Sequence, residues 1–174
     1  KFDNFTIREI RMEEGPRKGI IRHTSSTTVT MHESSIPLMN DFVIEVNLHN
    51  PYSLSQGAWS SGLGFRSTKW KGRQNYLGVS SDGSWFHNIY DPALVTRGAP
   101  VNGIYKGPSD TNSILVISVE DRAWFFINDS YVATLYLDGV FETGFFHVFT
   151  NYYQGHGKIG QSTKFDGLTV WSVN

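Results

Sequence analysis

The sequence predicts an all-β protein folded as a two-sheet antiparallel β-sandwich. Short apolar runs rich in β-branched and aromatic residues alternate with turn residues along most of the chain. The 174 residues include 17 glycines and 6 prolines, which supply many turns, and no segment keeps a helical period. The clearest stretch is 113–137, SILVISVEDRAWFFINDSYVATLYL, which we interpret as a three-stranded meander with polar turns at 120–122 and 128–130.

The strongest single strand signal is the alternation over residues 41–49. Phe42, Ile44, Val46 and Leu48 fall on one face, which we predict to be core. We expect a turn at 13–19, a hairpin turn at 81–84 and a long connection at 91–111. The remaining strands, about eleven or twelve in all with those already named, are expected at 2–10, 20–21, 27–31, 62–66, 75–80, 85–90, 144–150 and 165–173.

The meander is expected to complete this core. We predict that its core-facing members are Leu115, Ile117, Phe125 and Ile127.

The length suits a single domain that covers residues 1–174. One internal similarity bears on domain organisation: residues 1–7, KFDNFTI, echo residues 164–170, KFDGLTV. Residues 1–10 are either the closing strand of a preceding, similar module in a tandem array, or a strand of the same sheet with a similar composition.

Composition excludes several classes of protein. The formal net charge of −1 gives no electrostatic footprint for nucleic acid. No cysteine is present, so the chain has neither a disulfide framework nor thiol chemistry. No apolar run reaches the roughly 18 residues of a membrane-spanning helix, and the first residues do not read as a signal peptide, so we expect a mature or excised soluble domain without membrane insertion.

Two segments in the last third of the chain carry a family resemblance. The pattern Phe-Phe-Ile-Asn at 125–128, followed by Val-Ala-Thr-Leu at 132–135, resembles a hairpin of the concanavalin A-like jelly rolls, with Asn128-Asp129 in place of the commoner Asn-Gly. The segment 165–171, FDGLTVW, resembles the closing strand of the same sandwiches. These include laminin-G-like, pentraxin-like and glucanase-like domains. The resemblance implies a jelly roll from an exported protein, located extracellularly or at the cell surface.

The resemblance makes a search for catalytic residues necessary. Glucanase-type members carry Glu-x-Asp-x-x-Glu on one strand, because a retaining mechanism needs two neighbouring carboxyl groups. That pattern does not occur in this sequence: Glu45 has no carboxylate beside it on its strand, and Glu120 and Asp121 are adjacent. A Gly-x-Ser-x-Gly elbow is also missing from the sequence. We therefore expect that the chain is not an enzyme.

One metal site is implied by the resemblance. The six histidines show no spacing typical of zinc. Sandwiches of this kind, however, often hold a structural calcium ion through scattered carboxylates and carbonyls. Asp166, at the start of the closing strand, is either a calcium ligand or an aspartate that bonds its own turn.

Aromatic and polar residues in glycine- and serine-rich segments suggest a glycan-binding surface. Aromatic rings stack on the C–H faces of sugars, and Arg or His side chains donate to hydroxyl groups. Each residue has another interpretation, since a Trp is often core and surface cations are often only solvated. We hypothesise convergence on one rim, or on the concave face, of Trp59, Arg66, Trp70, Arg73, Tyr152, Tyr153 and His156.

The function predicted from these observations is a non-catalytic carbohydrate-binding, lectin-like module of an exported multidomain protein. Its expected partner is a glycan or polysaccharide. The alternative is a structural or adhesive repeat that contacts proteins, cell surfaces or neighbouring copies of the same module.

Overall fold

The structure is a computed structural model. It describes residues 9–25, 30–33, 38–67, 74–90, 95–137, 143–151 and 157–174. Within these ranges the chain forms twelve strands and one 3₁₀ turn, η1 (Leu54–Gln56), and no helix there is long and apolar enough to cross a membrane.

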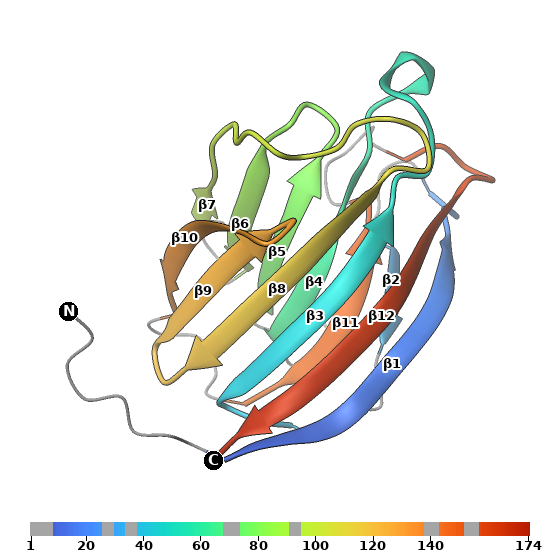
Figure 1. Cartoon of the computed structure of the whole chain (residues 1–174). Helices are drawn as coiled ribbons and strands as arrows, with labels where there is room; N and C mark the ends of the chain where they lie inside the picture. Colours follow the sequence, from blue (N-terminus) through green and yellow to red (C-terminus); the bar gives the residue numbers. More distant parts are fainter. Residues whose placement is uncertain are drawn as a thin grey trace.

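Two six-stranded sheets make up the fold (Figure 1), and every pairing between strands is antiparallel. The first sheet has the order β1 (Ile10–Arg22), β12 (Ser162–Val173), β3 (Phe42–His49), β8 (Thr111–Val119), β9 (Arg122–Ile127), β10 (Ser130–Tyr136). The second has the order β2 (Thr30–Glu33), β11 (Phe145–Thr150), β4 (Ser60–Ser67), β5 (Gln74–Ser80), β6 (Trp85–Tyr90), β7 (Val95–Arg97). The two-sheet antiparallel sandwich is therefore confirmed.

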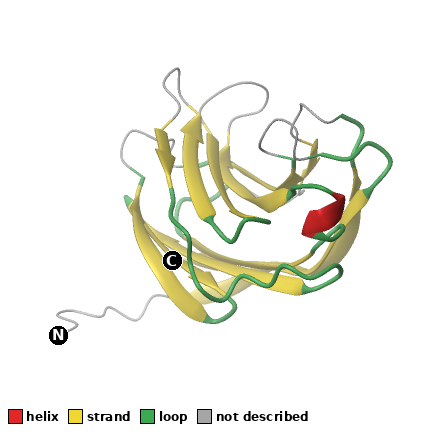
Figure 2. Cartoon of the chain, turned by 90° about the horizontal axis from the view of Figure 1, so that it is seen from above, coloured by secondary structure: helices red, strands yellow, loops and turns green. Residues whose placement is uncertain are grey.

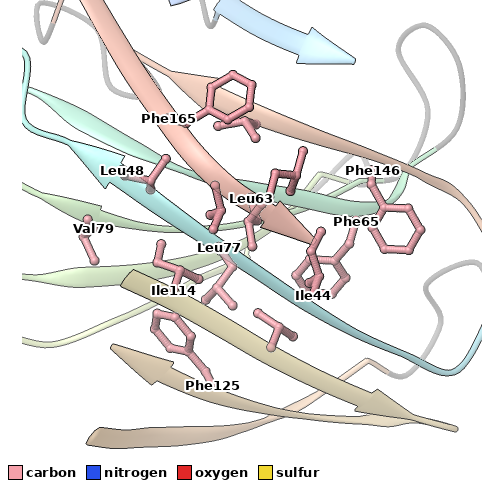
Figure 3. Packing of buried hydrophobic residues seen from close by; sticks show 14 of the residues in the cluster. Ile44, Leu48, Leu63, Phe65, Leu77, Val79, Ile114, Phe125, Phe146 and Phe165 are labelled. Carbon is pink, nitrogen blue, oxygen red and sulfur yellow. The ribbon is translucent and has the colours of Figure 1, made fainter. Parts of the chain in front are cut away.

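The first sheet bends around the second (Figure 2), and the core lies between them. The predicted inner face of β3 is confirmed, because Phe42, Ile44 and Val46 are fully buried and Leu48 nearly so. Side chains from both sheets interdigitate there (Figure 3), with Leu63, Phe65, Leu77, Val79, Phe146 and Phe165 among those that meet the inner face of β3 and β8.

The face predicted for β8 is wrong by one residue. Ile114 and Val116 point into the core, whereas Leu115 and Ile117 lie half-buried on the outer face. Val116 pairs with Phe125 and Ile114 with Ile127, so these partners share the inner face, and the prediction for Phe125 and Ile127 is confirmed. Because β8 carries apolar residues on both of its faces, its sequence does not alternate, and the core-facing side cannot be predicted from alternation.

The turn predicted at 13–19 is also wrong. β1 runs through these residues as one edge strand, with register shifts at Met12/Glu14, Glu14/Arg17 and Arg17/Gly19. An edge strand tolerates Pro16 because only one side of it needs backbone donors. Residues 1–8 lie outside the described ranges, so the tandem-module interpretation stays a prediction.

The meander has its predicted form. Strands β8, β9 and β10 follow one another in sequence and in the sheet. The turn between β9 and β10 places Asn128 and Asp129 at φ +48° and +63°, the left-handed conformation that a two-residue hairpin requires. Short side chains that tolerate this conformation therefore serve here in place of glycine.

Candidate functional site: the outer face of the second sheet

The central strand β4 of the second sheet is buried on both of its faces. All eight residues of β4 are buried, although only alternate ones can face the core. On the face turned away from the first sheet, Tyr76, Phe86 and Phe149 form a second apolar cluster, separate from the main core. Because the first sheet bends around the second, this outer face lies on the inside of the bend (Figure 2).

Strand register places further residues on the same face. Tyr76 pairs with Asn88 on one side and with Gly64 on the other, and Gly64 pairs with His147. Residues directly opposite one another in antiparallel strands share a face. Asn88, Tyr76, Gly64 and His147 therefore form one row across four strands.

A second row lies two residues further along the strands, and in it two phenylalanine rings pack against two glycines. Phe86 pairs with Gly78, Gly78 with Gly62, and Gly62 with Phe149. A Cβ on Gly78 would lie 2.8 Å from Cζ of Phe86, and a Cβ on Gly62 the same distance from Cζ of Phe149. The rings therefore pack directly against the backbone, which only glycine permits.

Aromatic side chains close the surface around these rows. The Tyr76 ring meets the Phe149 ring edge-on at 5.2 Å between centroids and the His147 ring at 5.5 Å. We call Tyr76, Phe86, Asn88, His147 and Phe149 the outer-face site.

Polar atoms of this site lack partners. The side chain of Asn88 is fully buried, yet among the residues that the structure describes neither its amide nitrogen nor its amide oxygen has a hydrogen-bond partner, and the same holds for Nε2 of His147. By contrast, Asn75 on the inner face of the same strand pair has its Oδ1 2.9 Å from Nε2 of His87. Unpaired buried amides are rare because each costs roughly 1–3 kcal/mol, so these polar atoms are available to bond a ligand or a water molecule.

The site carries no net charge near neutral pH. Desolvation by burial lowers the pKa of His147 to about 4, so its imidazole is neutral at physiological pH. Among its five residues no carboxylate or permanent cation is present. The chemistry on offer is an amide that can donate and accept, a neutral imidazole, and aromatic faces, which together suit an uncharged ligand that carries both hydroxyl groups and apolar C–H surface. The unpaired atoms are not exposed to solvent.

Trp59, predicted to stack on a ligand, is instead a core residue. Its side chain is completely buried within the main cluster, and its backbone N–H donates to Oγ of Ser81. The prediction is corrected because Trp59 directly precedes the buried strand β4 and packs into the core, although residues 54–58 before it are exposed or half-buried.

Arg66, predicted to donate to a ligand, is also corrected. It is buried, and its Nη2 lies within hydrogen-bond distance of the carbonyl oxygens of Asn40 and Glu120 and of Oγ of Ser118. These acceptors belong to β8 and to chain next to the first sheet, so Arg66 ties the end of β4 to that sheet.

The other five predicted ligand contacts, Trp70, Arg73, Tyr152, Tyr153 and His156, lie outside the described residues. The residues that flank them are informative. Segment 68–73 is flanked by Ser67, where β4 ends, and by Gln74, where β5 begins. The backbone N–H of Asn151, before segment 152–156, donates to the carbonyl oxygen of Ser60 at the other end of the eight-residue β4, about 23 Å away. The contacts predicted for these five residues stay a prediction.

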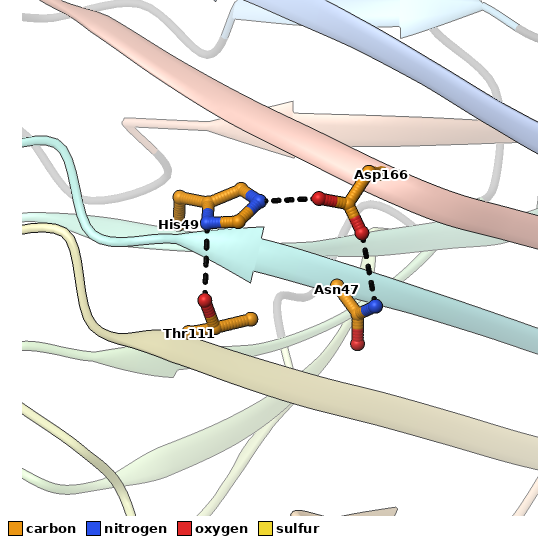
Figure 4. Close-up of polar contacts among 4 residues, drawn as sticks. All are labelled: Asn47, His49, Thr111 and Asp166. Atoms are coloured by element: carbon orange, nitrogen blue, oxygen red, sulfur yellow. Dashed lines mark hydrogen bonds and ion pairs between the residues drawn. The ribbon is translucent and has the colours of Figure 1, made fainter.

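Asp166, the predicted calcium ligand, lies on the outer face of the first sheet (Figure 4). Its Oδ2 is 2.6 Å from Nε2 of His49, and its Oδ1 accepts from Nδ2 of Asn47 at 3.0 Å. Oγ1 of Thr111 lies 3.0 Å from Nδ1 of His49, so the cluster ties together β12, β3 and β8. These interactions lower the pKa of Asp166, the bond from Asn47 being the largest cause and that from His49 the next.

This surrounding does not fit a calcium ion. Calcium takes six to eight oxygen ligands, whereas the groups aimed at Asp166 are nitrogens that donate to it. Across the part of the chain that the structure describes, no group of three or more His, Asp or Glu side chains could hold a metal ion.

Comparisons with known proteins show similarity in structure alone. No family model matches the sequence, and no curated protein matches it. A fructosyltransferase from A. japonicus superposes with a TM-score of 0.67 at 12% identity, over 95% of this chain. Carbohydrate binding module CBM66 from Bacillus subtilis superposes with a TM-score of 0.61 at 17% identity, over 95% of this chain and 97% of that one. An endo-β-1,3-glucanase from Pyrococcus furiosus gives a TM-score of 0.61 at 10% identity, over 95% and 74%.

These likenesses show that the fold is a concanavalin A-like jelly roll, as the sequence resemblance predicted. The chain spans only about a quarter of the length of the fructosyltransferases, matching 26% of each.

The expectation that the chain is not an enzyme is corrected. Its structural neighbours include a fructosyltransferase and endo-glucanases, so the fold is one on which catalytic chains are built. The search of the sequence for the glucanase motif tests for only one of the reactions that these neighbours catalyse.

Sequence reasoning missed the outer-face site. Asn88 and His147 belong to no motif, and their positions depend on pairing between distant strands. One signal was present: Gly62 and Gly64 alternate within an apolar strand, which indicates close approach by another group on one face.

Proposed function

We propose that the chain is a carbohydrate-binding module whose ligand, an oligosaccharide or polysaccharide, binds at the outer-face site. The observation that carries the proposal is the unpaired amide of Asn88, beside the unpaired imidazole nitrogen of His147 and three aromatic rings. Sugar hydroxyls supply the donors and acceptors that these atoms lack, and sugar C–H faces pack on aromatic rings. The similarity in fold to CBM66 over nearly the whole of both chains supports the same class.

The experiment is calorimetric titration of the protein with neutral glycans, beginning with fructans and β-1,3-glucans, because the structural neighbours include a fructosyltransferase and an endo-β-1,3-glucanase. We expect a ligand with Kd between about 1 µM and 1 mM. Asn88→Leu is expected to weaken binding by roughly tenfold or more, since two hydrogen bonds to the ligand are lost. The matched control is Gln161→Leu, an amide removed from an exposed position, which is expected to leave Kd unchanged.

Two results decide the proposal. Absence of binding across a broad panel of glycans contradicts it outright. Binding that Asn88→Leu leaves unchanged places the ligand elsewhere on the molecule. Assaying the same mixtures for released reducing sugar measures cleavage separately from binding.

We also propose that the parent protein acts outside the cell, where polysaccharides of this kind are met. Fractionation of the native host tests this, and recovery of the protein only in the cytosol contradicts it.

A further inference from the structure

The outer face of the first sheet divides into a polar half and an apolar half. The polar half holds Asp166 and the residues that bond it. In the apolar half, β-sheet pairing connects Met12 to Trp171, Trp171 to Val43, Val43 to Ile117, and Ile117 to Trp124. We call these five residues the apolar row.

The apolar row is accessible to solvent. Met12 is 56% exposed, and the other four side chains are only half-buried. The neighbouring row adds Leu115 and Phe126, both half-buried, and Tyr131, which is 57% exposed. On the other side of Leu115 this row is polar, with Glu45, which is exposed, on β3 and Thr169 on β12. An antiparallel sheet whose outer face meets water ordinarily carries polar residues there, so a contiguous apolar surface indicates a contact with something else.

The four residues of the row on β12, β3, β8 and β9 follow an order that is the same in kind from either direction. From β12 to β9 it reads Trp171, Val43, Ile117, Trp124, that is, two aliphatic residues flanked by two tryptophans. A two-fold axis that runs parallel to the strands, between β3 and β8, would bring each tryptophan over the other tryptophan of a second copy. It would also bring Val43 over Ile117 of that copy. Such a self-complementary patch is what an isologous dimer requires.

The available area sets the strength of the contact. From β1 to β9 the row crosses five strands about 4.8 Å apart, about 19 Å in all, and the two rows cover about 14 Å along the strands, which gives roughly 270 Å² per copy. Stable interfaces bury about 800 Å² per partner, and weak ones less than about 600 Å². The row itself has no charge to repel a second copy.

We infer that the apolar row binds a second copy of this chain, in a weak, reversible two-fold dimer that leaves the outer-face site on the far side of each sandwich. Such a dimer presents two binding sites that point in opposite directions, and linked sites raise avidity for a polymer that both can reach.

Sedimentation velocity between about 1 and 500 µM tests the inference, since a weak contact has a Kd in that range. The mass is expected to rise from the 19.7 kDa of one chain toward twice that value. Val43→Glu and Ile117→Lys are each expected to raise Kd at least tenfold. Ser113→Lys, on the same strand and face as Ile117 but in the polar half, is the matched control and is expected to leave Kd unchanged.

Mixing the two variants identifies the two-fold arrangement. In a mixed dimer the carboxylate introduced at 43 faces the ammonium introduced at 117, while the second contact keeps the native Val43 and Ile117. Association of the equimolar mixture, with neither variant associating alone, is the expected result. Circular dichroism and melting curves confirm that both variants are folded.

Three outcomes overturn the inference. In the first, the parent chain stays a monomer at every concentration. In the second, it dimerises and neither variant weakens the dimer. In the third, the variants abolish the dimer and mixing them does not restore it. If the parent is a monomer but Ile117→Lys abolishes binding to an insoluble polysaccharide, the row takes polysaccharide and not a second copy.

Discussion

The imidazole of His147 lies directly against the backbone of Gly64 on the neighbouring strand. A Cβ placed on Gly64 would come within 1.9 Å of Nε2 of His147, much closer than any real contact. The position of the imidazole therefore depends on the absence of a side chain at residue 64.

Gly64→Ala is accordingly expected to destabilise the protein by about 1–3 kcal/mol, the usual cost of an overpacked site. Urea unfolding measures the change. In a His147→Ala background, where the ring is gone, the same substitution is expected to cost much less, and the difference is the coupling energy of the pair. Equal costs in both backgrounds would show that the two residues do not touch.

Asn88→Leu is expected to leave the free energy of unfolding unchanged or to raise it, because the amide it removes is buried without partners. Asn75→Leu is expected to lower it by about 1–3 kcal/mol, because it leaves His87 without its bond to Asn75. The two positions are both buried and lie on adjacent strands, so they form a matched pair. A large loss of stability from Asn88→Leu in the absence of ligand would contradict the unpaired state of this amide.

His147 predicts a loss of stability in mild acid. Its pKa of about 4 in the folded state is below the 6.5 of an unperturbed histidine, so the unfolded chain binds the proton first. Its stabilising effect is complete above about pH 6.5 and is lost as the pH falls toward 4, a change on the order of 3 kcal/mol. Urea midpoints of the parent and of His147→Phe, compared from pH 7 to pH 4, measure it. The variant is expected to have the flatter profile, and parallel profiles contradict the assignment.

Asp166 predicts a second effect at lower pH. Because its folded pKa is lowered below 3.8, chiefly by the bonds from Asn47 and His49, its contribution is present above that value and is lost as the pH falls further. Asp166→Asn should therefore destabilise the protein at pH 7 and have less effect at pH 2.5 to 3. Because the carboxylate is half-exposed, we expect a small change, visible as a shift in Tm. A shift in Tm of the same size at both pH values would show that the charge of Asp166 does not contribute to the stability of the protein.

Chelation tests the calcium prediction directly. The donors around Asp166 are nitrogens, so we expect no change in Tm when EGTA is added or when calcium is restored. A drop in Tm with EGTA that Asp166→Asn abolishes would establish a calcium site there.

The sequence was sufficient for the fold because the relevant signals are local. Alternation along 42–48 and the Asn128-Asp129 turn each act over a few residues, and both are confirmed. The outer-face site could not be found in this way. Asn88 and His147 are brought to one face by pairing across β6, β5, β4 and β11, and pairing register is a property of the folded sheet.

The predictions of which side chains lie at the surface were wrong for a related reason. Trp59 stands among glycine and serine residues that are typical of loops, yet tertiary packing buries it completely. Ile117 shows the opposite error, since it is as apolar as its core neighbours but lies on the outer face. Hydrophobicity alone does not distinguish a core from an interface.

The place of β12 within the first sheet has a consequence for the order of folding. This strand is formed by residues 162–173, yet it lies between β1 and β3. Until these residues have been synthesised, β1 has no neighbour in its sheet and β3 has only β8. The nascent chain therefore exposes two unpaired strand edges, a feature that invites pairing with other chains. Contacts between the first and last strands also make slow folding the expectation, because the longest loop closes last. Correct production of this protein thus depends on the final twelve-residue strand inserting before its neighbours find other partners.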